Sequence, residues 1–340
     1  MIKILSASER IFYILWRRGQ EIINLVIIPV FPARLSNIIV EEDLFPASSL
    51  SYLRYNVFMP LPVPLEPVDY LLIGNLACDI TPDGLHLGGT ASYSALTARA
   101  LGMRVGVVTA WGGEIPLDAL AGIKVQEIPA EHSTTFENVY TSAGRIQTLH
   151  HTAPDLTFED VPAAWRRAPI VHIGPIAGEA KSVVDGKFPT ALLGLTPQGW
   201  LRKWDSTGRV SPGEWPEAHQ SLEKAGAAVL SIEDVAGDEE LIEAMASASR
   251  VLAVTEGADG VRLYWNGDIR CYHAPVMHEV DATGAGDIFA AAFFWRLYTT
   301  RDPWAAARFA TSLASCSVSR PGLDGIPTQE EIHTCLVEVI

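Results

Sequence analysis

The stretch Asp281-Ala282-Thr283-Gly284-Ala285-Gly286-Asp287 runs directly into the apolar residues 288–294. A glycine-rich turn that leads into a helix presents unpaired backbone N–H groups and the positive end of the helix dipole to an anion. A carboxylate at Asp287 would accept a proton from a substrate hydroxyl while these amides hold the phosphate under attack. A bare Gly-x-Gly would indicate only a helix start, but the full stretch, with a carboxylate at each end, favours phosphoryl transfer to an alcohol.

This stretch and the long small-residue helix behind it resemble the C-terminal signature of the ribokinase (PfkB) family of sugar and nucleoside kinases. The resemblance implies that Asp287 is the catalytic base. It also implies that the anion hole is formed by the backbone amides of Gly284, Ala285 and Gly286. A monovalent cation beside the Asp281 loop is common in the family, so dependence on K⁺ is a further expectation.

The composition describes a globular protein. A chain of 340 residues is long enough for one large α/β domain or two ordinary ones. Hydrophobic residues make up 48% and charged residues 19%, which is typical of a globular protein. The formal net charge of −15 argues against a general nucleic-acid or anionic-membrane binder, although one pocket can still favour a nucleotide. The four cysteines are scattered without a Cys-x-x-Cys pair, which favours a reduced, cytoplasmic setting.

The N-terminal segment differs from the rest of the chain. Its apolar stretches are shorter than the roughly 20 residues needed to span a bilayer, and it makes a poor secretory signal. A proline-rich stretch at 59–67 can neither continue a helix nor join a central strand. We expect residues 1–67 to be an extension, with the native protein starting at Met59, and residues 68–340 to form the kinase domain.

From residue 70 onward, apolar runs alternate with helical segments, which is the pattern of a parallel sheet covered by helices. Strands are predicted at 70–73, 104–109, 170–173, 227–231 and 250–254. Helices are predicted at 91–101, 238–247, 288–299 and 303–317. The fold class is therefore α/β, and the resemblance implies a ribokinase-like, mostly parallel central sheet flanked by helices on both faces. Ligands bind such sheets in the crevice at the carboxyl ends of the strands.

Two short hairpins are predicted to cover this crevice. Only nine positions separate Asp79 from Gly88, so residues 80–87 can make at most a short hairpin. Alternating residues at 134–151 indicate a second hairpin around a Ser-Ala-Gly turn. We expect these segments to form a small, reduced β lid, which would exclude water that competes for the phosphoryl group.

Two segments are candidates for binding the acceptor. Asp79 follows the first strand, where a carboxylate would accept hydrogen bonds from sugar hydroxyls or act only as a turn residue. Adjacent glycines let the backbone approach a ligand, and a following threonine can cap a helix; these residues are Gly88, Gly89 and Thr90. Both segments resemble sugar-contacting motifs of the family. The family's usual asparagine is replaced here by Tyr93 or Ser94.

The nucleotide and metal contacts are predicted from the resemblance. The segment at 255–260 looks like the family's nucleotide loop, and residues 315–322 look like the part that flanks the adenine. The implied nucleotide-binding residues are Thr255, Gly257, Gly260, Thr283 and Ser315. The family's Asn-x-x-Glu motif, which organises Mg²⁺ through water, has no asparagine here, so either Glu233 or Asp234 would act in its place. The motif at 195–202 resembles the family's Asp-Pro-Gln-Gly segment. Its Arg202 could pair with phosphates but is expected at the surface.

Together these features predict an ATP- and Mg²⁺-dependent kinase that phosphorylates a sugar or polyol, with myo-inositol ahead of ribose or fructose. A nucleoside kinase and a ribokinase-like protein that binds ligands without catalysis are the alternatives. A dinucleotide oxidoreductase is disfavoured because no Gly-x-Gly-x-x-Gly follows the first strand. We expect a small-molecule substrate, no nucleic-acid or membrane partner, and a monomer or homodimer.

Overall fold

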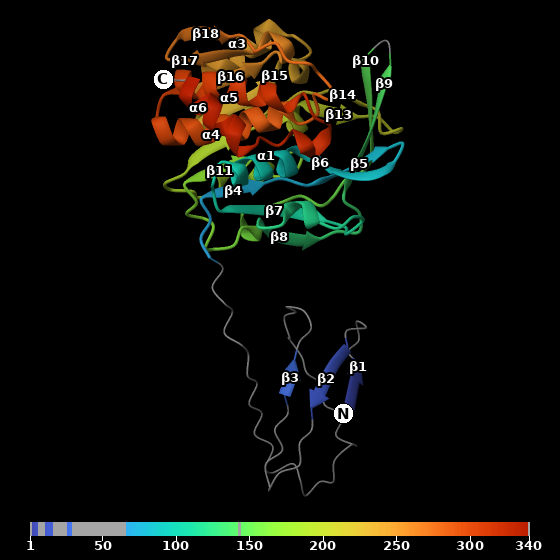
Figure 1. The fold of residues 1–340 in the computed structure, drawn as a ribbon. Coiled ribbons are helices and arrows are strands. Elements are labelled where there is room, and N and C mark those ends of the chain that lie inside the picture. The colour runs from blue at the N-terminus through green and yellow to red at the C-terminus, as the bar shows by residue number, and fades with distance from the viewer. Residues whose placement is uncertain (1, 6–10, 16–25, 29–65, 142–143, 339–340) are drawn as a thin grey trace, which may run out of the picture. The chain divides into compact units, whose positions relative to one another are not determined.

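The computed structural model describes residues 2–5, 11–15, 26–28, 66–141 and 144–338 (Figure 1). The chain divides into two units, Met1–Pro64 and Leu65–Ile340. In the first unit, three strands pair antiparallel in sequence order: β1 (Ile2–Leu5), β2 (Ile11–Leu15) and β3 (Val26–Ile28). The predicted native start at Met59 lies outside the described residues, so it stays a prediction, as does the assignment of the first 67 residues to an extension.

The second unit is built on a nine-stranded sheet. Its strands, in spatial order, are β18 (Asp268–Tyr272), β17 (Val261–Trp265), β16 (Val251–Thr255), β15 (Ala227–Ser231), β12 (Leu192–Leu195), β11 (Ile170–Ile173), β4 (Tyr70–Ile73), β7 (Val105–Trp111) and β8 (Lys124–Pro129). The seven strands from β16 to β8 run parallel, and the β17–β18 hairpin adds an antiparallel edge. The predicted mostly parallel sheet is confirmed.

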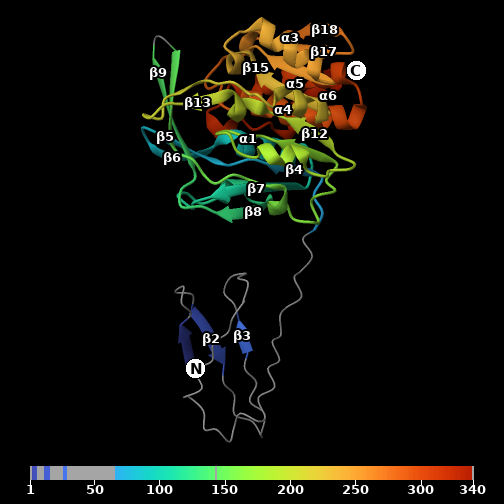
Figure 2. The same cartoon turned by 180° about the vertical axis from the view of Figure 1, so that it is seen from behind.

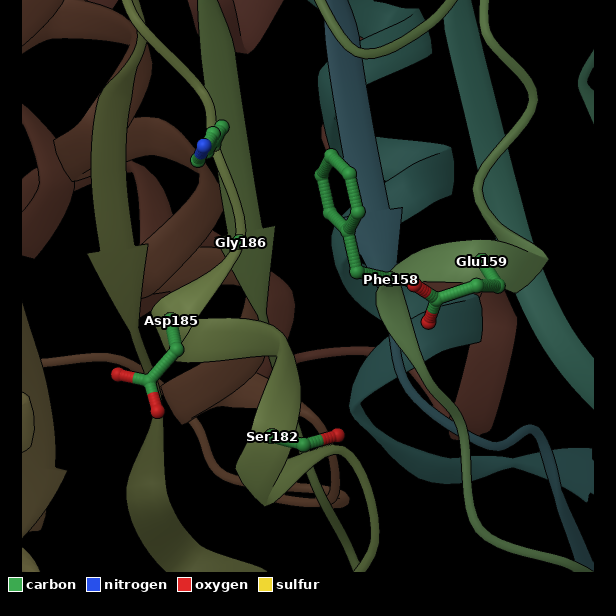
Figure 3. Close-up of a pocket in the computed structure, with 6 residues that line it drawn as sticks. Phe158, Glu159, Ser182, Asp185 and Gly186 are labelled. Carbon is green, nitrogen blue, oxygen red and sulfur yellow. The ribbon is translucent and has the colours of Figure 1, made fainter.

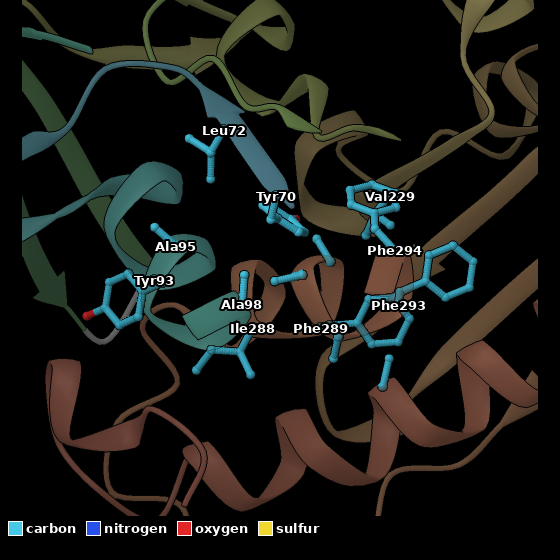
Figure 4. Packing of buried hydrophobic residues seen from close by; sticks show 14 of the residues in the cluster. Tyr70, Leu72, Tyr93, Ala95, Ala98, Val229, Ile288, Phe289, Phe293 and Phe294 are labelled. Carbon is cyan, nitrogen blue, oxygen red and sulfur yellow. The ribbon is translucent and has the colours of Figure 1, made fainter. Parts of the chain in front are cut away.

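Helices cover both faces of this sheet (Figures 1 and 2). One face is covered by α1 (Gly89–Ala100), α4 (Ala285–Thr300), α5 (Pro303–Ser317) and α6 (Gln329–Glu338). The other is covered by α2 (Ala218–Lys224) and α3 (Glu239–Ala248). Successive side chains of a strand point to opposite faces, so Tyr70 and Leu72 join the first core and Leu71 and Ile73 the second (Figure 4). This two-sided burial explains why the central strands are continuous apolar runs.

The two predicted hairpins form a single four-stranded sheet, which we call the lid sheet. Its order is β10 (Gly144–His151), β9 (Thr134–Thr141), β5 (Ala77–Thr81) and β6 (Gly84–Gly88). The hairpins join because β5 pairs parallel with β9, with Asp79 opposite Phe136. Strand β5 begins three residues before the predicted lid boundary at residue 80. Across the described part of the chain, none of the helices is long and apolar enough to cross a membrane.

Candidate active site

Asp287 lies in the first turn of α4, three residues after Gly284, a position that two features of the structure reserve for glycine. Gly284 has a φ of +79°, a conformation that side chains other than glycine rarely adopt. A Cβ at Gly284 would also lie 2.2 Å from Cδ1 of Tyr93, because this α1 ring packs against the glycine. At Gly286, by contrast, a Cβ would meet no atom within 4 Å. At the start of α4 there is therefore no room for a side chain at Gly284, whereas there is room for one at Gly286.

The three predicted anion-hole residues are not equivalent. The Ala285 N–H already donates to the Ala282 carbonyl at 3.2 Å. The first N–H groups of a helix have no partner within the helix, and Gly286 combines such a position with an exposed surface. Of the three, Gly286 has the geometry that best suits an incoming anion.

Helix α1 holds the Asp287 residue in place through two hydroxyls. The Ser94 hydroxyl donates to the Asp287 backbone carbonyl at 3.0 Å. The buried Thr90 side chain forms a hydrogen bond with the Asp287 carboxylate. Thr90, which was predicted to contact the acceptor, lies beside the predicted base.

The electrostatic environment of Asp287 raises its pKa from 3.8 to about 6. Burial is the main cause of the rise, and the negative charges of Asp234 and Asp79 add to it. The hydrogen bond from Thr90 and the positive charge of Arg202 act in the opposite direction. The Asp287 carboxylate is thus ionised at neutral pH, yet basic enough to accept a proton.

On the lid sheet, Asp79 lies against the predicted glycine pair. A Cβ at Gly88 would fall 1.8 Å from Oδ2 of Asp79, so only glycine leaves room for this carboxylate. Gly89 has a φ of +83°, and a Cβ there would lie 3.1 Å from Cβ of Ala77. Close packing against β5 therefore accounts for both glycines without any ligand.

Arg202, at the start of β13 (Arg202–Trp204), belongs to this site and is only half-exposed. Its guanidinium carbon lies 5.5 Å from the centre of the Phe136 ring on the lid sheet, and its Nη1 donates to the Ile176 carbonyl at 3.2 Å. Its charge also lowers the pKa of both Asp287 and Asp234. The expectation of a surface arginine is therefore wrong.

The two candidates for organising Mg²⁺ differ in position. Asp234 is half-buried and accepts hydrogen bonds from the Ser231 N–H at 2.8 Å and from Nε2 of Gln198 at 3.2 Å. Glu233 is exposed. Burial raises the pKa of Asp234, and its charge in turn acts on Asp287, so Asp234 is the member of the pair that faces the site.

The described residues contain no group of three histidine, cysteine, aspartate or glutamate side chains placed to hold a metal ion. Mg²⁺ usually keeps several waters and is bound by one or two carboxylates together with substrate phosphates. A single carboxylate at Asp234 therefore fits an indirect, water-mediated role.

The predicted nucleotide residues lie at the end of β16 and in the loop after it, in the loop before α4, and within α5. Thr255 ends β16, and its hydroxyl donates to the Leu230 carbonyl at 3.4 Å. In the following loop Gly257 is exposed with a φ of +59°. Gly260 has a φ of +102°, and a Cβ there would lie 2.0 Å from the Tyr272 carbonyl oxygen. These glycines are explained by backbone conformation and close packing.

Asp281 joins the loop that leads into α4 to the residues after α5. Its Oδ1 accepts from the Thr283 N–H at 2.9 Å, and its Oδ2 accepts from the Gly322 N–H at 2.8 Å. Thr283 itself is exposed. Ser315 is buried and donates its hydroxyl to the Thr311 carbonyl within α5, so its side chain serves the helix.

A separate surface pocket of about 410 Å³ lies away from these groups (Figure 3). It is lined by Phe158, Glu159, Ser182, Asp185, Gly186 and Lys187. None of these six side chains contributes to the environment of Asp287, so this pocket is not the candidate active site.

Comparison with known sequences identifies kinases. The model of the pfkB family of carbohydrate kinases matches residues 218–329. A cytidine kinase from Thermococcus kodakarensis is 28% identical over 251 residues, which cover 66% of this chain and 87% of that protein. The ribokinase of Bacillus subtilis is 40% identical over 95 residues, which cover 28% of this chain and 32% of that enzyme.

Solved structures share the fold. A pyrophosphate-dependent kinase in the ribokinase family, complexed with a pyrophosphate analog and myo-inositol, has a TM-score of 0.67 at 21% identity, covering 78% of this chain and 99% of that chain. A putative ribokinase II from E. coli, in complex with ATP and Mg²⁺, has a TM-score of 0.62 at 19% identity, covering 79% and 99%. The family match, the related sequences and the shared fold together support a phosphotransferase that is similar to the carbohydrate kinases of the ribokinase (PfkB) family.

Proposed function

We propose that this enzyme transfers the γ-phosphoryl group of ATP to a hydroxyl of an uncharged sugar or polyol. The observation that carries the proposal is the position and the pKa of Asp287. It lies at the N-terminus of α4, and burial raises its pKa to about 6. A general base works best when its pKa lies near the working pH, and Asp287 meets that condition.

Charge stabilisation is assigned to the start of α4. In phosphoryl transfer, catalysis rests mainly on positioning and on stabilising the charge of the transferring group. The helix dipole and the open amide of Gly286 would supply part of that stabilisation beside Asp287. Arg202 would supply a positive charge on the lid side.

ATP and Mg²⁺ are the proposed cofactors. The match to the pfkB family model and the similarity to the E. coli ribokinase II complex with ATP and Mg²⁺ support this assignment. When bound, Mg²⁺ would neutralise charge on the nucleotide phosphates, and Asp234 is the residue proposed to hold it through water. The dependence on K⁺ remains a prediction from the family resemblance.

The charges around Asp287 favour an uncharged acceptor. Three carboxylates, Asp79, Asp234 and Asp287, share the site with one guanidinium, that of Arg202. An acceptor that carries its own phosphate or carboxylate would be repelled by this excess of negative charge. A polyol or sugar would instead donate hydrogen bonds to Asp79. The candidates are myo-inositol, ribose and fructose, and the structural similarity to a myo-inositol-bound kinase supports the first.

A nucleoside kinase is the second candidate, because the cytidine kinase is matched over most of its length. Nucleoside bases are commonly stacked on aromatic side chains. The Phe136 ring on the lid sheet already lies under the guanidinium of Arg202, at 5.5 Å. This contact favours a sugar or polyol over a nucleoside.

ADP formation from ATP should be measured with myo-inositol, ribose, fructose, cytidine and fructose 6-phosphate, with Asp287→Asn as the control. We expect stimulation by an uncharged sugar or polyol and its loss in the variant. Stimulation by cytidine alone would identify a nucleoside kinase, and stimulation by the sugar phosphate alone would refute the charge argument. If no acceptor responds with ATP or with pyrophosphate as donor, a ligand-binding protein without catalysis becomes the better interpretation.

A further inference from the structure

Among the buried side chains that tie the lid sheet to the large sheet is that of Asn75, which lies between β4 and β5. Its Oδ1 accepts from the Ala110 N–H of β7 at 2.8 Å. Its Nδ2 donates to the Pro154 carbonyl, just after β10, at 3.2 Å. A single amide thus connects the large sheet to the point where the chain leaves the lid sheet, and Asn75 itself lies where the chain enters it.

A buried carboxylate holds the backbone of the same residue. Glu179 is 4% exposed, and its Oε1 accepts from the N–H groups of Asn75 at 3.1 Å and of Ile176 at 2.9 Å. Its Oε2 accepts from the Ala177 N–H at 2.8 Å. Burial raises the pKa of Glu179. A buried carboxylate is costly unless it is hydrogen-bonded, and here backbone donors offset the cost.

The loop around Glu179 also reaches the acceptor side of the site. The Ile176 carbonyl accepts from Arg202, which lies over Phe136 of the lid sheet. The Glu179 carbonyl accepts from Nε1 of Trp200 at 2.7 Å. The loop that contains Glu179 therefore contacts both Asn75, where the chain enters the lid sheet, and Arg202, the arginine beside Asp287.

The packing around the end of the lid sheet is open. A cavity of about 510 Å³ is lined there by Glu131, His132, His150, His151, Thr152, Ala153 and Pro154. Dense packing alone therefore does not fix this segment. Its position depends on directed bonds, including one from the Ala180 N–H to Oδ1 of Asp155 at 2.6 Å.

We propose that Asn75 and Glu179 are positioning residues that set the pose of the lid sheet over the acceptor. The inference rests on the proposed function, in which the acceptor binds against Asp79 of that sheet. The side chains that act on the pKa of Asp287 are Thr90, Arg202, Asp234 and Asp79. Neither Asn75 nor Glu179 is among them, so the pair reaches Asp287 only through the lid sheet and Arg202, and its direct effect is on the acceptor side of the site.

Two isosteric variants test the pair. Asn75→Asp keeps the acceptor for Ala110 but places a carboxylate oxygen opposite the Pro154 carbonyl. Glu179→Gln places an amide NH₂ among backbone donors. The matched control, Thr311→Val, removes a buried hydrogen bond inside α5, from Thr311 to the Ala307 carbonyl.

We expect each of the two variants to raise the KM for the acceptor about tenfold, while the KM for ATP changes less than about twofold. The control should leave the acceptor KM unchanged. An unchanged acceptor KM in Asn75→Asp, or equal rises in both KM values, would overturn the proposal. If Glu179→Gln does not fold, Asn75→Asp decides alone.

Hydrogen exchange measured by mass spectrometry tests, without any enzymatic turnover, whether Asn75 holds the lid sheet in place. Asn75→Asp should exchange faster in β5, β6 and β9, with α4 and α5 unchanged, and Thr311→Val should not affect the lid sheet. If the parent protein phosphorylates no acceptor, the proposed function fails. The exchange measurement still decides whether Asn75 positions the lid sheet. Unchanged exchange in the lid sheet of Asn75→Asp would overturn the positioning role.

Discussion

The stretch at 281–287, which leads into α4, carries a carboxylate at each end, and the two have opposite properties. Burial alone would raise the pKa of Asp281, but hydrogen bonds from Thr283 and from the Gly322 N–H outweigh it and hold the pKa below its ordinary value. Burial prevails at Asp287 and raises its pKa to about 6. The hydrogen bonds that reach each carboxylate thus separate a structural carboxylate from a base only six residues further along the chain.

The largest effect is expected from Asp287→Asn. The substitution keeps the size of the side chain and removes its ability to accept a proton. We expect kcat to fall by a factor of about 10² to 10⁴, the usual contribution of a general base. Steady-state kinetics with ATP and the best acceptor would measure it. Near-normal turnover in a folded variant would contradict the assignment of the base.

The second-largest effect is expected on stability, when the glycines between Asp281 and Asp287 are substituted. Gly284→Ala would place a Cβ in the Tyr93 ring at a φ of +79°, so we expect a loss of about 2–4 kcal/mol in the free energy of unfolding. Gly286→Ala is the matched control, because a Cβ there meets no atom within 4 Å. Urea unfolding would compare them, and equal stabilities would show that the Tyr93 contact is unimportant.

The buried strands were predictable because they are continuous apolar runs, and those at 70–73, 170–173 and 227–231 coincide with β4, β11 and β15. The β17–β18 hairpin was missed. Its turn is Asn266-Gly267, with φ values of +52° and +76°, and such a pair between alternating strands is a strong hairpin signal that the sequence does contain.

Much of the site depends on contacts between residues that are distant in sequence. Arg202 lies over Phe136 only because the lid sheet folds back toward the large sheet, and no local pattern around residue 202 indicates that. Asn75 and Glu179 are 104 positions apart. The loop at 281–287 was predictable because its glycines, helix start and carboxylates are contiguous.

The two carboxylates should also have opposite effects on stability at pH 8. The pKa of Asp281 is lowered in the folded state, so its ionised form stabilises the fold above the ordinary pKa of aspartate. Asp281→Asn should therefore cost about 1–2 kcal/mol at pH 8, and the loss should shrink as the pH falls below 4.

For Asp287 the sign is reversed. The pKa is raised, so the unfolded chain releases this proton first, and the ionised carboxylate costs stability as the pH rises from about 4 to about 6. Asp287→Asn should then be more stable than the parent at pH 8 by up to about 2 kcal/mol, and the gain should disappear near pH 4. Thermal unfolding across pH would measure both variants. If both variants changed the stability at pH 8 in the same direction, the two carboxylates would not have opposite effects on the fold.

The smallest expected effect concerns the neighbour that helps to raise the pKa of Asp287. In the parent, kcat/KM should fall on the acid side near pH 6, because kcat/KM reports the ionisation of the free enzyme. Asp234→Asn removes a negative charge that raises this pKa, so the acid limb should move about half a pH unit lower, whatever happens to the maximal rate. Glu233→Gln is the control, since Glu233 is exposed and does not act on Asp287. If Asp234→Asn and Glu233→Gln shift the acid limb of kcat/KM equally, the charge of Asp234 does not specifically raise the pKa of Asp287.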